Sequence, residues 1–295
     1  MTKGKLKCER CDECLGLGCV GQLPGLGGVF NNQNFQLNCE GWKELYKKSA
    51  SAGAPLSNKI DEIKIEPHHL RCGPVTGAVE NIGYENEEDF YYPYLKAAAD
   101  AGIGLCVGDG CPDLKLQLGV ATMKRLATRA AFFLKPYPDE RLYERVEWVK
   151  PYAEYIGIDI DSYNILTMRN LVSLERKTAA QLENFRKRFD VPFVIKGVFT
   201  DEDIALVKEV HPDVVYISNH GGRVETRIGS TANFLEKHAV ELKKYCREIW
   251  VDGGIRSRQD VQTALFYGAD KVIFARPLIH AVFDNTLDNF WKKIF

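Results

Sequence analysis

The chain lacks an apolar run long enough to cross a bilayer, because no stretch approaches about 18 consecutive apolar residues. Its opening residues, MTKGKLKCERC, lack the apolar segment of a secretory signal peptide. A surplus of positive charge is also missing, since 39 Lys and Arg stand against 40 Asp and Glu, a formal net charge of −1. We therefore expect a cytoplasmic protein with no membrane span, and the charge balance argues against a nucleic-acid binder.

What is present is an ordinary globular composition, with 45% hydrophobic and 27% charged residues. A length of 295 residues would suit two average domains, but a single barrel of roughly 250 residues is as common. The composition alone does not separate these two arrangements.

Four of the nine cysteines fall within twelve residues, at Cys8, Cys11, Cys14 and Cys19. This spacing suits tetrahedral zinc or an iron–sulfur cluster, and Cys39 could replace one ligand. A third interpretation is thiols, or partly disulfide-bonded cysteines, with no metal. In a reducing compartment, cysteines are expected as thiols or metal ligands in preference to disulfides. Zinc, an iron–sulfur cluster and cysteines without a metal all stay open.

The region around these cysteines differs from the rest of the chain. Residues 1–60 are rich in Gly, Asn and Cys and contain little periodicity, apart from an expected helix at 40–52. We expect residues 1–60 to form an irregular leader that packs on a larger body spanning residues 61–295.

Beyond the leader, short apolar runs alternate with segments of helical period. The apolar runs are 74–79, 102–107, 130–135, 155–160, 192–196, 213–218, 248–252 and 271–275. The helical segments are 86–101, 113–127, 139–152, 178–189, 201–210, 231–246, 257–267 and 277–292. Eight such units predict a (β/α)8 barrel with parallel strands. An open doubly wound sheet is less favoured, because no G-x-G-x-x-G follows the first run.

Glycines and arginines follow the last two predicted strands, in DGGIRS at 252–257 and ARP at 275–277. Active sites of such barrels lie at the carboxyl ends of the strands. Glycines let backbone N–H groups approach an anion, and Arg256 and Arg276 add charge. These two segments predict a phosphate site.

The segment SNHGGR at 218–223 follows the sixth predicted strand. His220 is the natural general base near neutral pH, and Arg223 offers a fork suited to a substrate carboxylate. Lys196 ends the fifth strand, where a buried ammonium is costly unless it meets an anion or an electron-rich group. We predict these three residues as the catalytic group.

Residues 192–283, which include PFVIKGVFTDEDI, VVYISNHGGR, WVDGGIRSRQDV and GADKVIFARPL, resemble the FMN-dependent α-hydroxy acid oxidases and dehydrogenases. The leader resembles that of a shortened bacterial branch of this family. The resemblance implies that His220 removes the substrate α-hydrogen, that Arg223 grips the carboxylate and that Lys196 lies beside the flavin. The other positions it implies for FMN binding are Ala78, Val79, Glu80, Gly108, Ser218, Asp252, Gly253, Gly254, Arg256, Ala275 and Arg276.

The chain departs from the family pattern at the third and fourth strands. Where the family has a flavin-binding Gln and a substrate-binding Tyr, this chain has Phe133 and Lys135. A second substrate arginine has no clear counterpart, with Arg169 a candidate by position only. Asp159 or Asp161 is expected to partner His220.

The resemblance implies an FMN enzyme that oxidises a small 2-hydroxy carboxylate, with a homo-oligomer as a further expectation. One alternative is an FMN-dependent isomerase of the isopentenyl diphosphate type, against which the intact N-H-G-G-R argues. Another is a redox relay or sensor whose cysteines hold a metal. The substrate and the electron acceptor stay open.

Overall fold

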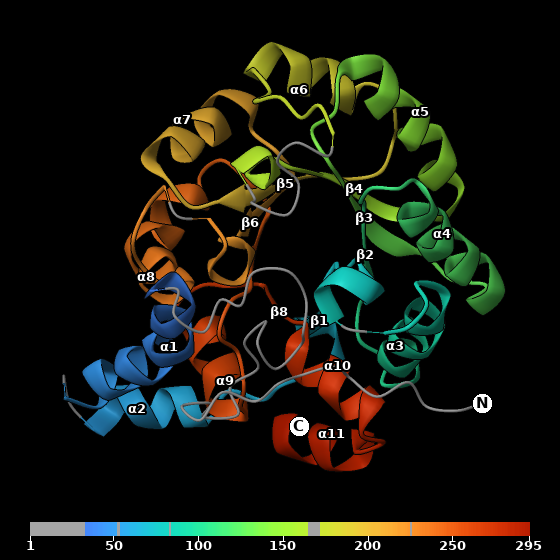
Figure 1. The fold of residues 1–295 in the computed structure, drawn as a ribbon. Coiled ribbons are helices and arrows are strands. Elements are labelled where there is room, and N and C mark those ends of the chain that lie inside the picture. The colour runs from blue at the N-terminus through green and yellow to red at the C-terminus, as the bar shows by residue number, and fades with distance from the viewer. Residues whose placement is uncertain (1–32, 52–53, 83, 165–171, 225) are drawn as a thin grey trace.

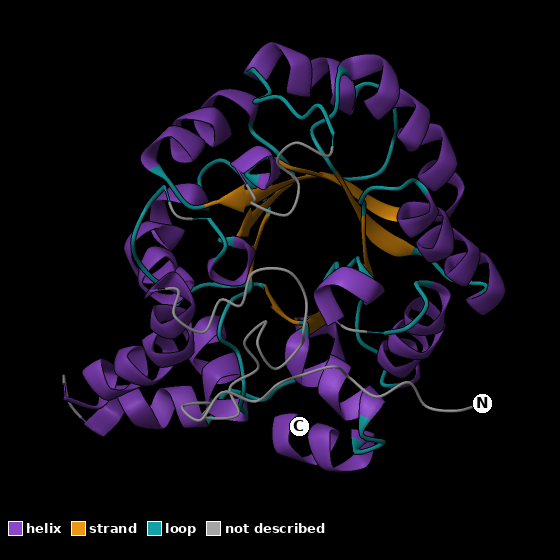
Figure 2. Ribbon diagram, in the orientation of Figure 1, coloured by secondary structure: helices purple, strands orange, loops and turns teal. Residues whose placement is uncertain are grey.

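The computed structural model describes residues 33–51, 54–82, 84–164, 172–224 and 226–295. Eight parallel strands run up the centre, and helices form an outer ring around them (Figures 1 and 2). The strand order is β1-β8-β7-β6-β5-β4-β3-β2, and a single bridge between Arg71 and Gly104 joins β1 to the segment before β2. The predicted (β/α)8 barrel is confirmed.

The strands are short and almost wholly buried. They are β1 (Leu70–Cys72), β2 (Cys106–Gly108), β3 (Ala130–Leu134), β4 (Ala153–Asp159), β5 (Phe193–Val198), β6 (Val214–Ile217), β7 (Glu248–Val251) and β8 (Lys271–Phe274). Six of the eight predicted runs overlap β3 to β8 closely, because continuous Val, Ile and Phe suit strands buried on both faces.

The first strand was predicted in the wrong place. Residues 74–79 were expected to be the strand, but β1 precedes them and residues Ala78–Ile82 form a π-helical turn. Glu87 holds that turn, since its carboxylate accepts hydrogen bonds from the backbone N–H groups of Gly77, Ala78 and Val79. The second strand also lies later than predicted.

The ring consists of helices that follow the strands. They are α3 (Glu88–Asp100), α4 (Leu114–Leu126), α5 (Asp139–Val149), α6 (Ala179–Arg186), α7 (Asp201–Val210), α8 (Thr231–Leu242), α9 (Arg258–Phe266), α10 (Arg276–Phe283) and α11 (Leu287–Ile294). Thr178, Thr200 and Ser257 begin α6, α7 and α9 with capping boxes. The helix predicted at 277–292 is two helices, α10 and α11.

The described part of the leader is helical rather than irregular. α1 (Gln33–Ser51) and α2 (Ala54–Asp61) pack on α8 and α9 beside the barrel (Figure 1). α1 therefore begins seven residues before the predicted helix. Cys8, Cys11, Cys14 and Cys19 lie outside the described residues, whereas Cys39 is a buried free thiol on α1.

Two apolar clusters make the core. The larger lies between strands and helices, and the smaller fills the barrel interior with Phe133, Tyr216 and Trp250 among its members. Phe133 packs edge-on against both of these rings, so it belongs to the barrel core. No helix of the described residues is long and apolar enough to cross a membrane.

Candidate active site

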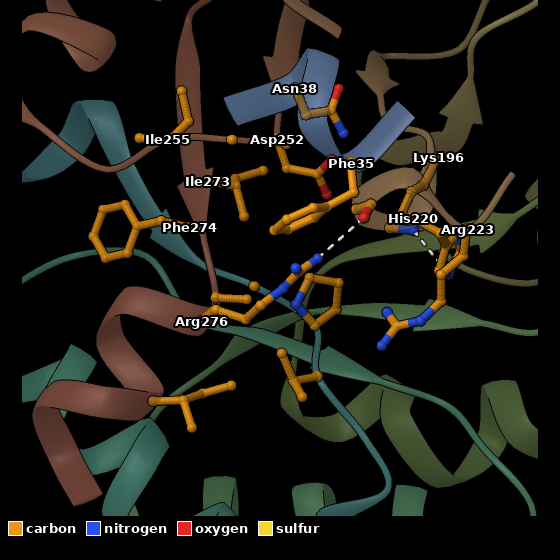
Figure 3. A pocket seen from close by; sticks show the side chains of 18 of the residues that line it. Phe35, Asn38, Lys196, His220, Arg223, Asp252, Ile255, Ile273, Phe274 and Arg276 are labelled. Carbon is orange, nitrogen blue, oxygen red and sulfur yellow. Dashed lines mark hydrogen bonds between the residues drawn. The ribbon is translucent and has the colours of Figure 1, made fainter. Parts of the chain in front are cut away.

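A cavity of about 180 Å³ opens at the carboxyl ends of the strands. Its wall comes from segments that are far apart in sequence: α1, the residues after β1, Lys135, Lys196, the β6–α8 loop, the β7–α9 loop and the start of α10. Figure 3 shows Lys196, His220 and Arg223 together at one side and Arg276 reaching across from α10. The position agrees with the strand-end rule for such barrels.

Most of the predicted site residues meet at this cavity. Those that line it are Lys196, His220, Arg223, Asp252, Gly253, Gly254, Arg256, Ala275 and Arg276. Ala78, Val79, Gly108 and Ser218 are not among the described residues that line it, and Gly73, Pro74, Val75 and Thr76 occupy the β1 side instead. Gly108 lies directly behind Pro74, because a Cβ on it would come 2.5 Å from the Pro74 carbonyl oxygen.

His220 sits in a left-handed turn. His220, Gly221 and Gly222 all have positive φ, at 53°, 63° and 94°. Glycine adopts this region freely, but a histidine there costs about 1–2 kcal/mol. The side chain of Asn219 closes the turn, since its Oδ1 accepts a hydrogen bond from the Gly222 N–H at 3.0 Å. The strained turn aims the His220 imidazole at two carboxylates.

Both candidate partners contact His220, which answers the question the sequence left open. Asp161 Oδ2 lies 2.7 Å from His220 Nδ1, and Asp159 Oδ2 lies 3.1 Å from Nε2. With its proton on Nδ1 directed at Asp161, the imidazole has Nε2 left to take a proton. A proton arriving there would then face Asp159, so the two carboxylates would stabilise the cation that forms.

Asp159 is also the counter-charge of two lysines. Its Oδ2 accepts from Lys135 Nζ and its Oδ1 from Lys196 Nζ, each at 2.6 Å. Burial opposes ionisation, but the charges of His220, Lys135 and Lys196 outweigh it and hold the pKa of Asp159 well below its usual range. For Lys196, the carboxylates of Asp159, Asp161 and Asp252 outweigh burial and raise its pKa. The Lys135 position therefore belongs to a charged network that the sequence did not reveal.

Burial dominates the electrostatics of two arginines of the cavity, Arg223 and Arg256. Burial of the guanidinium lowers the pKa of Arg223 to about 10, and among the described residues no acidic side chain forms an ion pair with it. Burial also lowers the pKa of Arg256, although Cys39 and Asp260 oppose the shift. Arg276 donates to the Gly221 carbonyl at 3.1 Å, drawn as the dashed line at Arg276 in Figure 3. This donor set suits an anionic ligand.

Two lining residues, Phe35 and Asn38, come from α1 and were missed from the sequence. Phe35 packs over the Arg276 guanidinium, 4.9 Å from ring centre to Cζ. Asn38 exchanges side-chain hydrogen bonds with Asn219, at 2.7 and 3.2 Å. They lie about 180 residues before the loop they contact, so no local pattern could have linked them.

Gly197 is the residue that makes room for Asp161. It has φ +96°, and a Cβ on it would lie 2.5 Å from both Cγ and Oδ1 of Asp161. We expect Gly197→Ala to push Asp161 away from His220 and to lower kcat by about 10²-fold, because displacements near 1 Å at a catalytic group have effects of that size. Steady-state kinetics would measure the loss.

Gly268→Ala is the matched control. Gly268 has almost the same φ, +99°, but a Cβ there meets only the Ala239 Cβ at an ordinary 3.4 Å. Both variants carry the backbone cost of alanine at positive φ, and only the first crowds Asp161. Equal kcat values for the two variants would contradict the role given to Gly197.

The comparisons with known proteins agree with this geometry. The family model described as FMN-dependent dehydrogenase matches residues 123–285, more than half of the chain. The chain belongs to this family of FMN-dependent dehydrogenases. The match covers the segments that carry Lys135, Lys196, His220, Arg223, Arg256 and Arg276.

Curated relatives match part of this chain. It is 34% identical over 113 residues to a peroxisomal (S)-2-hydroxyacid oxidase of Arabidopsis thaliana, which covers 38% of this chain and 31% of that protein. It is 35% identical over 120 residues to an L-lactate dehydrogenase of Vibrio parahaemolyticus, with the same two coverages. The matched segment thus spans about a third of the length of these relatives.

Solved structures share the fold over nearly the whole chain. A mandelate oxidase variant with 2-hydroxy-phenylacetamide superposes with a TM-score of 0.65 at 18% identity, covering 95% of this chain and 86% of that one. A second mandelate oxidase variant, with an FMN adduct, gives 0.64 at 19% identity, covering 95% and 87%. At these identities the likeness shows the barrel fold, and the chemistry has to be argued from the site.

Proposed function

We propose that this protein is an FMN-dependent oxidoreductase that oxidises a small 2-hydroxy carboxylate to the 2-oxo acid. The observation that carries the proposal is one cavity that brings together a histidine with two carboxylate partners and an arginine that has no acidic partner among the described residues. Of the three functions considered from the sequence, the family match favours this one over the isomerase and the redox relay.

The residues present fit FMN. Small residues at one end of the cavity, Gly253, Gly254 and Ala275, lie beside Arg256 and Arg276, a combination that suits a phosphate. Lys196, at the other end, is the cation for an electron-rich ring. The cavity is smaller than the roughly 300 Å³ usual for ligands of drug size. One side chain that crosses this cavity is Arg276, which donates to the Gly221 carbonyl at 3.1 Å (Figure 3).

The reaction removes two electrons and two protons from the substrate. Bound FMN would accept the two electrons and one of the two protons. Arg223 would bind the carboxylate with its guanidinium fork, which fixes C2 near His220. His220 would take a proton on Nε2 while Asp161 holds Nδ1, and Asp159 would stabilise that proton. Lys196 would place its positive charge beside the ring.

Other features remain proposals. We retain residues 1–60 as a leader and 61–295 as the barrel, although α1 supplies two cavity residues. The roles of Ala78, Val79, Glu80, Gly108 and Ser218 toward FMN also stay predictions, as does the homo-oligomer. Zinc or an iron–sulfur cluster at Cys8, Cys11, Cys14 and Cys19 gains no support from the family match.

An anaerobic visible spectrum tests the function without any knowledge of the electron acceptor. We expect the protein, purified or reconstituted with FMN, to show a flavin band that bleaches when glycolate, L-lactate or L-mandelate is added. The 3-hydroxy acid of matching length should leave the band unchanged, because its hydroxyl does not reach the position beside His220.

Two results would count against the proposal. If the protein binds no FMN after reconstitution, the proposed reaction has no electron acceptor in the cavity and the proposal fails. A flavin band that none of the three 2-hydroxy acids bleaches would show that the cavity serves another chemistry.

A further inference from the structure

α1 is bonded to the loop that carries His220 and Arg223 along most of the length of that loop. Asn34 Nδ2 donates to the carbonyls of Val224 and Arg227 at 2.7 and 2.8 Å, and its Oδ1 accepts from the Gly229 N–H at 2.8 Å. One helical turn later, Asn38 pairs with Asn219. Both α1 asparagines are 1% exposed, so water cannot replace these hydrogen bonds if they break.

The contact is closest at the strained turn itself. A Cβ on Gly222 would lie 2.5 Å from the Phe35 backbone nitrogen, which places the α1 backbone directly against the turn. Asn219 Oδ1 accepts from both Asn38 and the Gly222 N–H. A histidine held at positive φ persists only where its surroundings over-determine it, and α1 supplies those surroundings.

The same helix contacts the glycine loop after β7. A Cβ on Gly253 would lie 3.1 Å from Asn38 Nδ2, and one on Gly254 would lie 1.7 Å from the Asn38 carbonyl oxygen. Trp42 Nε1 donates to the Gly253 carbonyl at 2.7 Å. Asn38 Oδ1 also accepts from the Thr231 N–H, the first residue of α8. Asn38 therefore touches both the glycine loop and the loop with His220.

We infer that Asn38 is a positioning residue that couples the phosphate end of the cavity to the catalytic turn. Its amide fixes Asn219, which fixes the His220–Gly222 turn, while its backbone and side chain pack on Gly253 and Gly254. An anion that orders the glycine loop then also orders His220. The inference goes beyond the proposed function but rests on it for the role of His220.

Asn38→Ala tests the coupling. We expect FMN affinity to fall about tenfold and kcat to fall by at least tenfold, since small displacements of a catalytic group have large effects. The ring resonances of His220 should shift in the NMR spectrum of ¹⁵N-histidine-labelled protein, with His220→Asn providing the assignment. Asn219→Ala should reproduce the kcat loss and the shift. The double variant should lose no more than the worse single one, because both changes remove the same amide pair.

Ser49→Ala is the matched control. Ser49 is also a buried polar residue of α1, and it bonds across to the Tyr267 hydroxyl at 2.6 Å without touching either loop. The FMN affinity, kcat and His220 resonances of Ser49→Ala should stay near those of the wild type, even if its melting temperature falls as much as that of Asn38→Ala.

The inference is overturned if Asn38→Ala behaves like Ser49→Ala in these readouts, or if the losses of Asn38→Ala and Asn219→Ala multiply. If the wild-type protein oxidises no 2-hydroxy acid, the proposed function fails, yet FMN affinity and the His220 resonances still decide the coupling.

Discussion

Replacing His220 by asparagine is expected to lower kcat about 10²- to 10⁴-fold while FMN stays bound, since a positioned general base contributes that much. Asparagine is the informative replacement because its amide can still donate to Asp161, which lies 2.7 Å from Nδ1 in the wild-type protein. The carboxylate would keep a partner, and the cavity would lose only the nitrogen that takes the proton. Stopped-flow reduction of the flavin by a saturating 2-hydroxy acid measures the loss.

His238→Asn is the control for this variant. His238 is buried on α8 and does not line the cavity, so its replacement should leave kcat within about twofold of wild type. A His220→Asn protein that keeps its flavin and more than a tenth of the wild-type kcat would assign the proton transfer to another group.

The sequence predicted most of the barrel because its strands are plain apolar runs. It failed where a strand or helix buries polar residues. β1 was missed because Arg71 interrupts its pattern. This arginine is buried, lies over the Tyr155 and Trp250 rings and pairs with Glu154 at 2.7 Å. α1 was expected to begin near residue 40 because the helix was predicted from the spacing of apolar residues, and the buried Asn34 and Asn38 add nothing to that pattern.

The site shows the same division. His220, Arg223 and Lys196 were predicted because strand ends in a barrel meet at one rim. The Lys135–Asp159 pair and the α1 asparagines were not, because each depends on a partner distant in sequence. On α1, the two buried asparagines that hide the start of the helix from a hydrophobic pattern also contact the loop that carries His220.

Within the charged network, we expect the neutralisation of Asp159 to destabilise the fold the most. Asp159 is 3% exposed, and its carboxylate pairs with Lys135, Lys196 and His220. Asp159→Asn removes the carboxylate that pairs directly with two buried ammonium groups, and breaking a buried pair in this way costs about 3–5 kcal/mol. The added replacement Lys135→Met should restore part of the loss, because one of the unpaired charges is then removed. Urea denaturation at pH 7 measures the free energies of unfolding.

The effect should depend on pH in a defined direction. The pKa of Asp159 is depressed in the folded protein, so the native state holds the ionised form more strongly than the unfolded chain does. Its stabilisation is complete above the ordinary aspartate pKa of about 3.9 and is lost as the pH falls toward the depressed value. The gap between wild type and Asp159→Asn should therefore narrow when denaturation is repeated near pH 3.5. Asp100→Asn, which breaks the exposed Lys96–Asp100 pair, should cost less than about 1 kcal/mol at either pH, and a similar loss for both variants at pH 7 would contradict the central place given to Asp159.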